Sequence, residues 1–296
     1  MKKRLQKMGV GSFVFDCVNT VILLLLALIA LYPCWYVLMA SVSDPAKLHQ
    51  GSAFLVLPRD FGIYSYKSVM ENAALWIGYR NTFLYVTLGT LFSVMLTVSA
   101  AFCATRRDLP GKNTIMMLIL FTMYFSGGMI PTYMVVRGVG ILNTPLAMIL
   151  PNAINTYNLI ITMSYFRTIP DSLEEAASID GAGPLRIFMQ ILIPLAKPII
   201  AVIGLYYAVA TWNDYFNAMI YITNPKYKPL QVVLRQILMQ EGGTAATANA
   251  SGGEAAAYAE NIRYATIVVS TVPILCVYPF IQKFFIKGVM IGAVKG

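Results

Sequence analysis

Long apolar runs constrain the fold of this 296-residue chain more than any other feature. Val21 to Leu31 is uninterrupted, and almost no charge occurs near residues 82–104, 114–136, 144–166, 198–222 and 264–286. With its flanks, each run reaches about 20 residues, enough to cross a ~30 Å hydrocarbon core at ~1.5 Å per residue. Only 12% of the residues are charged, about half the share typical of soluble domains. We therefore predict an all-α integral membrane protein rather than a soluble protein with six buried helices.

Turn residues and charges between the runs predict the organisation of the chain. We expect residues 1–296 to form a single transmembrane domain with six spans, at about 12–41, 81–105, 114–137, 144–167, 195–222 and 262–287. Two larger loops, 43–80 and 223–261, lie on one side of the membrane. The Gly127-Gly128 pair and Pro131 predict close packing or a kink in the third span. Residues 241–260 are mostly Gly, Ala, Thr, Ser and Asn, a composition typical of a mobile loop unless a partner orders it.

The distribution of basic residues predicts the orientation of the spans. Both chain ends and the loops after spans two and four carry thirteen Lys and Arg against five Asp and Glu, whereas the other side carries nine against six. Lys and Arg concentrate on the cytoplasmic side of membrane proteins, so both termini are expected in the cytoplasm and the loops 43–80 and 223–261 outside. This asymmetry accounts for the net charge of +9 without a nucleic-acid partner. The first span reads as an uncleaved anchor, because no small-residue cleavage site follows it.

The segment between spans four and five is the most informative part of the sequence. From Pro170 to Pro198 it reads PDSLEEAASIDGAGPLRIFMQILIPLAKP. Asp171 is expected as the N-cap of a short amphipathic helix, with Glu174 three residues on. Gly181 and Gly183 break this helix, and a second one opens at Pro184. Pattern alone also fits a plain interfacial loop, but that interpretation does not explain an acidic turn on the basic side of the membrane.

The residues give no sign of catalysis or of a metal site. The spans contain no histidine, His49 falls in an external loop, and the four cysteines (17, 34, 103 and 276) lie in or beside apolar segments. The chain has no Gly-x-x-x-x-Gly-Lys-Ser/Thr loop for nucleotide binding. No catalytic residue, cofactor or metal is therefore assigned to this chain.

The segment's spacing resembles a known family signature. Glu175-Ala176-Ala177 is followed by Gly181, Ile191 and Pro194. This resembles the EAA signature of bacterial ABC importer permeases: Glu-Ala-Ala, three residues, Gly, nine residues, Ile, any residue, Leu, Pro. The sequence departs from it only by Ile193 in place of Leu. Further motifs resemble the maltose-permease-like class of carbohydrate importers, nearest the branch for complex oligosaccharides and polysaccharide fragments: Arg80-Asn81-Thr82, Asp180-Gly181-Ala182, Trp212-Asn213-Asp214 and Phe285 to Gly292.

The resemblance implies a type I ABC importer permease in the bacterial cytoplasmic membrane. Residues 171–190 would be the coupling helices that dock on an ATPase and drive alternating access for an oligosaccharide. The implied partners are a second homologous permease chain, two cytoplasmic ATPase subunits that bind ATP and Mg, and an extracytoplasmic solute-binding protein, which the loop between spans five and six would reach. The residues implied in coupling are Glu174, Glu175, Ala176, Ala177, Asp180, Gly181, Ala182 and Gly183.

Polar residues inside the spans are candidates for the sugar path. Asn155, Asn158 and Thr162 recur at helical spacing in span four, and a carboxylate at mid-depth in span five marks a water-lined cavity or a pairing site. Amides, hydroxyls and aromatic faces suit a sugar, although hydrogen bonding between helices explains the asparagines equally well. The candidates are Asn155, Asn158, Tyr207, Thr211, Trp212, Asn213, Asp214 and Tyr215.

Two other classes of function compete with an importer subunit. An ion-coupled secondary carrier for a polar solute would use Asp214 and Asp16 as ion sites, but it leaves the acidic 171–190 segment unexplained. A membrane-embedded enzyme would need a His/Asp or Cys/His arrangement, which the spans do not contain.

Overall fold

The computed structural model describes residues 10–48, 54–106, 108–249 and 254–293, and these residues form helices and connecting turns without a strand. The predicted all-α class is confirmed. The chain divides into two compact units, Met1–Asn72 with Gln236–Val272, and Ala73–Arg235 with Pro273–Gly296. His49 and residues 250–253 lie outside the described residues.

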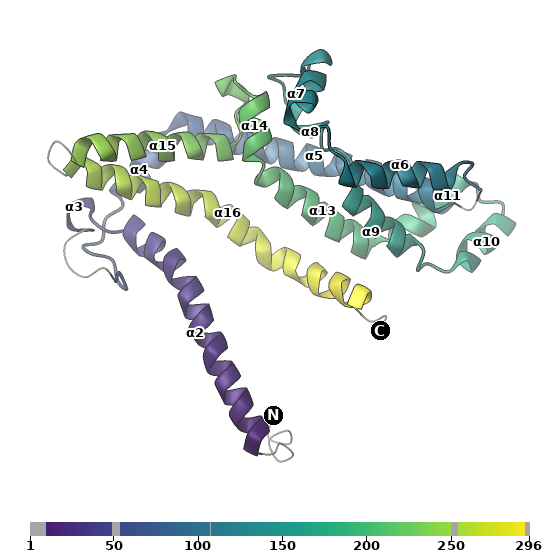
Figure 1. Cartoon of the computed structure of the whole chain (residues 1–296), viewed down its shortest axis with the longest axis horizontal. Helices are drawn as coiled ribbons and strands as arrows, with labels where there is room; N and C mark the ends of the chain where they lie inside the picture. Colours follow the sequence, from purple (N-terminus) through teal and green to yellow (C-terminus); the bar gives the residue numbers. More distant parts are fainter. Residues whose placement is uncertain (1–9, 49–53, 107, 250–253, 294–296) are drawn as a thin grey trace. The chain divides into compact units, whose positions relative to one another are not determined.

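The first unit contains α2 (Val10–Ser41), α3 (Pro45–Leu48), α4 (Tyr64–Glu71) and the first part of α16 (Glu254–Ala293) (Figure 1). Buried Asn261 of α16 links the elements of this unit by hydrogen bonds. Its side-chain amide donates to the carbonyl oxygens of Ala40, 2.7 Å away, and Ser43, 3.1 Å away, and accepts a hydrogen bond from Ser65 of α4. One amide thus satisfies backbone carbonyls where α2 ends.

The second unit carries the remaining elements. In chain order they are α5 (Ala73–Thr105), α6 (Lys112–Tyr124), α7 (Met129–Gly138), α8 (Leu146–Ile149), α9 (Thr156–Phe166), α10 (Asp171–Ile179), α11 (Pro184–Ile187), a π-helical turn η1 (Phe188–Leu192), α12 (Ile193–Leu195), α13 (Lys197–Trp212), α14 (Tyr215–Tyr221) and a 3₁₀ turn η2 (Pro225–Tyr227). α15 (Leu230–Asn249) begins in this unit and continues into the first.

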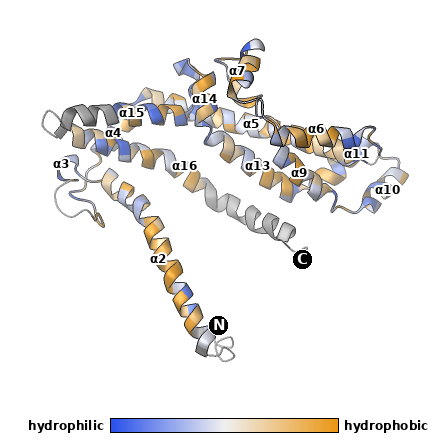
Figure 2. Ribbon diagram, viewed as in Figure 1, coloured by the Kyte–Doolittle hydropathy of each residue, from blue (hydrophilic) through white to orange (hydrophobic). Residues whose placement is uncertain are grey.

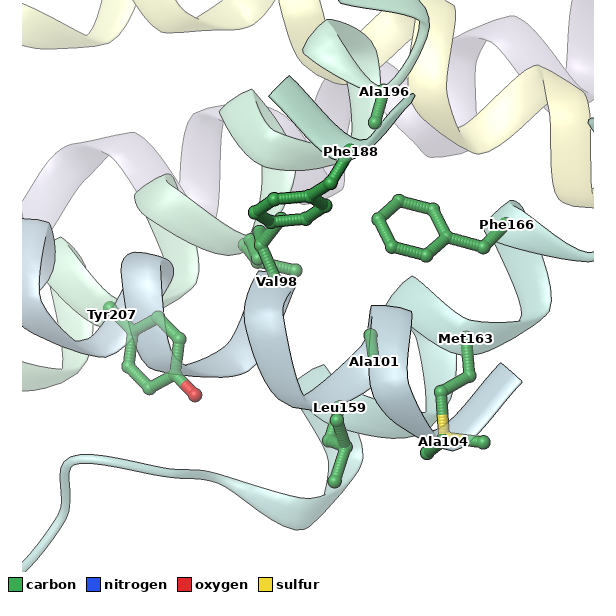
Figure 3. Packing of buried hydrophobic residues seen from close by; sticks show 10 residues of the cluster. Val98, Ala101, Ala104, Leu159, Met163, Phe166, Phe188, Ala196 and Tyr207 are labelled. Atoms are coloured by element: carbon green, nitrogen blue, oxygen red, sulfur yellow. The ribbon is translucent and has the colours of Figure 1, made fainter. Parts of the chain in front are cut away.

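The 33-residue helix α5 is the axis of the second unit, with α9 and α13 packed along it. The main core lies between them. It joins Val98, Ala101 and Ala104 of α5 to Phe166 of α9 and Phe188 of η1, and Figure 3 shows these side chains facing one another. Small residues on α5 allow its neighbours to approach closely, as is usual between membrane helices.

The N-terminal end of α5 holds the segment that follows α14. Asn81 donates from its amide to the carbonyl oxygens of Lys226, at 2.8 Å, and Lys228, at 3.0 Å. A Cβ on Gly78 would lie 3.0 Å from the Cα of Leu230, so only glycine permits this approach without a shift. Residues 226–230 are therefore held against the N-terminal end of α5.

The structure corrects several predicted span boundaries. α5 starts eight residues before the predicted start at 81, because Ala73, Ala74 and Leu75 are good helix formers. The predicted span 114–137 is two helices, α6 and α7, that meet at 116° where Gly128 adopts φ +84°. The expected kink at the glycine pair is thus a full break.

Spans four and five are also interrupted. The predicted span 144–167 is α8 and α9, separated by a turn that contains Pro151, which has no backbone N–H to continue a helix. The predicted span 195–222 breaks at Asn213 and Asp214, between α13 and α14. Hydropathy cannot locate such breaks, because the apolar pattern continues on both sides of them.

Among the described residues, two helices are long and apolar enough to cross a membrane, Val14–Ser41 and Ala73–Thr105. Two bent pairs also qualify if each counts as one span: Lys112–Tyr124 with Met129–Gly138, and Pro184–Leu195 with Lys197–Trp212. Figure 2 shows α2 covered with apolar residues over its middle part, and Leu24, Leu28 and Leu31 are more than half exposed. An exposed apolar surface of this extent requires lipid or another chain around it.

The 241–260 stretch differs from its prediction as a loop. α15 extends to Asn249 and α16 begins at Glu254. Alanine, the strongest helix former, recurs through both ends of the stretch and outweighs the cost of its glycines.

Candidate functional site

A cavity of about 720 Å³ opens in the second unit where two interrupted helices meet α5. Polar side chains from α9, from α13 and α14, and from the turns before α9 and α14 face it together with Ser93 of α5. The lining residues are Gly89, Ser93, Met148, Ile149, Asn152, Ile154, Asn155, Tyr157, Asn158, Tyr206, Tyr207, Ala210, Thr211, Asn213, Asp214 and Asn217.

The first interruption places the N-terminus of α9 at the cavity. Asn155 is the N-cap of this helix, with its side-chain oxygen accepting from the backbone N–H of Asn158 at 3.1 Å. Asparagine at this position satisfies one of the otherwise unpaired N–H groups of the first turn. Two of the predicted asparagines thus share the wall of the cavity because one of them begins the helix.

The hydroxyl of Tyr207 joins three helical segments beside the cavity. It lies 2.7 Å from the Oγ1 atom of Thr97 on α5 and accepts a hydrogen bond of 2.9 Å from the backbone N–H of Asn155. The ring belongs to α13 and is 5% exposed. A buried hydroxyl with both partners satisfied fixes the register of α5, α9 and α13 where no regular helix bond is available.

The second interruption places Asp214 at the start of α14. Its two carboxylate oxygens accept from the backbone N–H of Asn217 at 3.2 Å and from the side-chain amide of Asn217 at 3.0 Å. A carboxylate at a helix N-terminus is stabilised by the unpaired N–H groups there. Asp214 thus caps α14 and also lines the cavity.

Six of the eight predicted path residues line this cavity, and two do not. Trp212 is buried edge-on against the ring of Phe83, with ring centroids 5.6 Å apart. The Tyr215 hydroxyl donates to the Met219 sulfur and accepts a hydrogen bond from Arg235. Helical rotation explains both cases, because neighbouring residues on a helix point about 100° apart. Thr162, the third member of the span-four stripe, is fully buried and bonds the carbonyl of Asn158 within its own helix.

Several cavity residues were not predicted from the sequence. Ser93 faces the cavity from an apolar helix, and Asn152 and Asn217 belong to the turn before α9 and to α14. The rings of Tyr157 and Tyr206 lie with centroids 6.5 Å apart. Asn152, next to Pro151, and Asn217, three residues after Asp214, could have been found from the sequence, because asparagine is common where a helix begins.

The side chains of the wall are mostly neutral hydrogen-bonding groups. The lining residues, all of them described, include five asparagines, three tyrosines, Ser93 and Thr211. Among them Asp214 is the one carboxylate and no side chain is basic. Within the described part of the chain, no group of three or more His, Cys, Asp or Glu could hold a metal ion. Such a wall suits a hydroxyl-rich ligand.

The predicted coupling segment forms two short helices, as expected. α10 ends in a turn in which the N–H of Ala182 donates to the carbonyl of Ala177, at 2.9 Å, and that of Gly181 donates to Ser178, at 3.0 Å. These two bonds make a Schellman motif, and Gly181 supplies the positive φ, +79°, that it requires. Asp180, Gly181 and Gly183 are exposed, so the turn presents its acid and its backbone outward.

One detail of the segment was predicted wrongly. Pro170, not Asp171, occupies the N-cap position, and no side chain caps α10. Glu174 pairs instead with Arg106, its Oε2 atom 2.5 Å from the guanidinium. Glu174 and Glu175 line a second cavity of about 700 Å³ together with Arg106, which follows α5, and Lys112, which begins α6. The competing ion pair explains why a capping box does not form.

Comparison with known proteins gives concordant matches. Residues 73–291 match the family described as binding-protein-dependent transport system inner membrane component. The chain is 40% identical to the polygalacturonan/rhamnogalacturonan transport system permease protein YtcP of Bacillus subtilis, covering 95% of this chain and 98% of that protein. It is 29% identical to the melibiose/raffinose/stachyose import permease protein MelC of the same organism, covering 81% and 84%.

A solved structure matches over nearly the same length. It is a crystal structure of a bacterial ABC transporter involved in the import of the acidic polysaccharide alginate, with a TM-score of 0.85 and 34% identity over 94% of this chain and 99% of the matched chain.

The Tyr207 junction makes a testable prediction. Tyr207→Phe removes the hydroxyl shared by Thr97 and the N–H of Asn155, and leaving buried groups unpaired costs about 1–3 kcal/mol. We expect a lower thermal unfolding temperature for the purified protein in detergent. Tyr206→Phe is the matched control, because Tyr206 lines the same cavity and no hydrogen bond of its hydroxyl is seen in the described structure. Equal unfolding temperatures for the two variants would contradict the role of this hydroxyl.

Proposed function

Because this chain belongs to the binding-protein-dependent transport system inner membrane component family and is the permease component of an ABC importer for oligosaccharides, we propose that the 720 Å³ cavity is its half of the sugar path. The chain is not an enzyme, and its partner ATPase hydrolyses the ATP. The observation that carries the proposal is the meeting of two broken helices at one polar cavity. Irregular backbone at membrane depth is tolerated where it lines such a cavity.

The proposed substrate is an oligosaccharide cut from an acidic polysaccharide. Two matched proteins support this class by their names, one for polygalacturonan and rhamnogalacturonan and one for alginate. The amide and hydroxyl donors of the cavity can bond to both the hydroxyls and the carboxylates of a uronate. The negative charge of Asp214 opposes a uronate carboxylate close to it, because its hydrogen bonds from the neutral Asn217 do not remove that charge. The acidic class therefore rests on the names of the matched proteins and on the neutral donors of the wall.

The proposed lever is the segment 171–190, through which the ATPase drives alternating access. Its support is the exposed Schellman turn at Gly181, flanked by Glu175 and Asp180 on one side and by small Ala182 on the other. Carboxylates can meet basic groups of a partner through charge-assisted hydrogen bonds, and small residues permit close approach.

The proposed assembly follows from the family. This permease would pair with a second permease chain, two ATPase subunits carrying ATP and Mg, and an external solute-binding protein. We place it in the bacterial cytoplasmic membrane with six spans and both termini inside, on the basis of its charge asymmetry and apolar surface.

The orientation can be tested with single cysteines in a variant without Cys17, Cys34, Cys103 and Cys276. Val139→Cys, at an exposed position after α7, should react with a membrane-impermeant maleimide in intact cells, because it lies outside in our topology. Ser178→Cys in α10 should react only after the cells are permeabilised. Labelling of Ser178→Cys in intact cells would reverse the topology and end the lever assignment.

The lever assignment predicts a loss of ATPase attachment. Gly181→Asp adds bulk and charge to the turn, so the ATPase subunits should co-purify at one tenth of the wild-type amount or less. Gly140→Asp is the matched control, because Gly140 also has positive φ, +77°, and open space around it, but lies in the turn after α7. Full attachment of the ATPase in the Gly181→Asp importer would refute the assignment.

The cavity assignment predicts a transport defect at Thr211. In the importer reconstituted with its binding protein, trigalacturonate should stimulate ATP hydrolysis more than stachyose does. Thr211→Val removes one hydroxyl from the wall, and a hydrogen bond is worth about 1 kcal/mol, so uptake at sub-saturating substrate should fall about two- to tenfold. Thr271→Val on α16, where the hydroxyl bonds its own helix, should leave uptake unchanged. Unchanged uptake in the Thr211→Val importer would remove this residue from the path.

A further inference from the structure

The first helix of the proposed lever, α10, packs only loosely against the rest of the protein. None of the nine side chains of α10, all of which the structure describes, is buried. Leu173 and Ile179, its two large apolar residues, are 43% and 87% exposed. A helix with so few apolar contacts cannot transmit a displacement to the membrane helices through a packed core. Its polar contacts therefore determine which helix moves with it.

Arg106 provides such a contact at the C-terminal end of α5. Its guanidinium lies 2.5 Å from Glu174 of α10 and, on its other side, 4.0 Å from the centre of the Phe102 ring. The side chains of Arg106 and Glu174 are 32% and 28% exposed, so the pair is partly shielded from water. Stacking on an aromatic face holds a guanidinium in one orientation, which a lysine ammonium does less well.

The second part of the lever, α11 and η1, contacts the same end of α5. The Phe102 ring packs against Phe188 of η1, with ring centroids 4.7 Å apart, and Phe188 follows α11 directly. The end of α5 therefore contacts both parts of the lever: Arg106 binds α10, and Phe102 packs against η1. Lys112 donates to the carbonyls of Thr105 and Arg106 at 3.2 and 3.0 Å, which satisfies the last turn of the helix.

α5 connects this point to the cavity without a break. Arg106 follows its last residue, whereas Thr97 and Ser93, which meet Tyr207 and the cavity, lie nine and thirteen residues earlier. Thirteen residues of α-helix span about 20 Å. The alternative route through α12 and α13 contains the π-helical turn and a bend of 79°. An uninterrupted helix transmits displacement more directly than one with a hinge in its path.

We propose that Arg106 is a positioning residue that couples the lever to the cavity. It links α10 to the C-terminal end of α5, so that a displacement of α10 moves α5 and with it the cavity wall. The inference rests on the proposed function of the 171–190 segment. It gives α5 a part in coupling, which the Glu-Ala-Ala pattern alone does not indicate. The pair acts within this chain, so it is separate from any contact between the lever and the ATPase.

The test follows the cavity wall and does not depend on the identity of the sugar. In the importer purified with its partner chains and free of native cysteines, Asn152→Cys reports access to the cavity by its rate of reaction with a charged methanethiosulfonate. We expect ATP with vanadate to change this rate at least fivefold in the parent protein and less than twofold after Arg106→Gln. The ATPase should remain attached in both.

Further variants separate the ion pair from mere packing. Arg106→Lys should retain most of the response, and the double exchange Arg106→Glu with Glu174→Arg should restore at least half of it, although Glu174→Arg alone should lose it. Arg167→Gln is the matched control, since Arg167 lines the same 700 Å³ cavity and shows no ion pair in the described structure. Its response should equal that of the parent.

The results distinguish this proposal from the one on which it rests. A full response in Arg106→Gln, a failure of the double exchange to restore it, or loss of the ATPase from Arg106→Gln would each overturn the role of Arg106. If Gly181→Asp retains both the ATPase and the response, the lever assignment itself fails, whatever Arg106 does.

Discussion

A chain that crosses lipid has to satisfy its own backbone polar groups, and this constraint decides where the helices of this protein can end. The interruptions before α9 and α14 in the second unit are repaired locally. Asn155 and Asp214 accept N–H groups at the starts of α9 and α14, and the Tyr207 hydroxyl accepts the N–H of Asn155. These repairs require polar side chains at positions that would otherwise be apolar, and the side chains that make them gather around one cavity. The site is thus a consequence of how the breaks are stabilised.

The contrast between broken and continuous helices gives the second unit its mechanical character. α6 and α7, α8 and α9, and α13 and α14 are interrupted pairs, whereas α5 runs for 33 residues with its small residues facing α9 and α13. The interrupted helices supply polar groups and places to bend, and the continuous one can carry a displacement along its length. Segments that bend are usually found next to such rigid elements in proteins that alternate between two states.

The sequence predicted the helical class, the membrane character and the two-helix form of the 171–190 segment, because these depend on composition and on local turn residues such as Gly181. It did not predict the breaks at Pro151 and Asp214, because hydropathy averages over windows longer than the breaks. Tertiary contacts were beyond it as well. Glu174 was expected to cap its own helix, and only the fold brings Arg106, 68 residues away, close enough to compete. Trp212 and Tyr215 were grouped with their neighbours by proximity in sequence, although the helix turns them away from the cavity.

The composition of the cavity wall also bears on how long a ligand can stay. Amides and hydroxyls contribute about 1 kcal/mol each, so a set of four would be worth about 4 kcal/mol before the cost of association, a dissociation constant of about 1 mM or weaker. With an association rate of about 10⁶ M⁻¹s⁻¹, the residence time is on the order of a millisecond. If the cavity is the proposed sugar path, a wall of many weak neutral groups around one carboxylate favours passage over retention. Tight capture would have to be the task of a different protein.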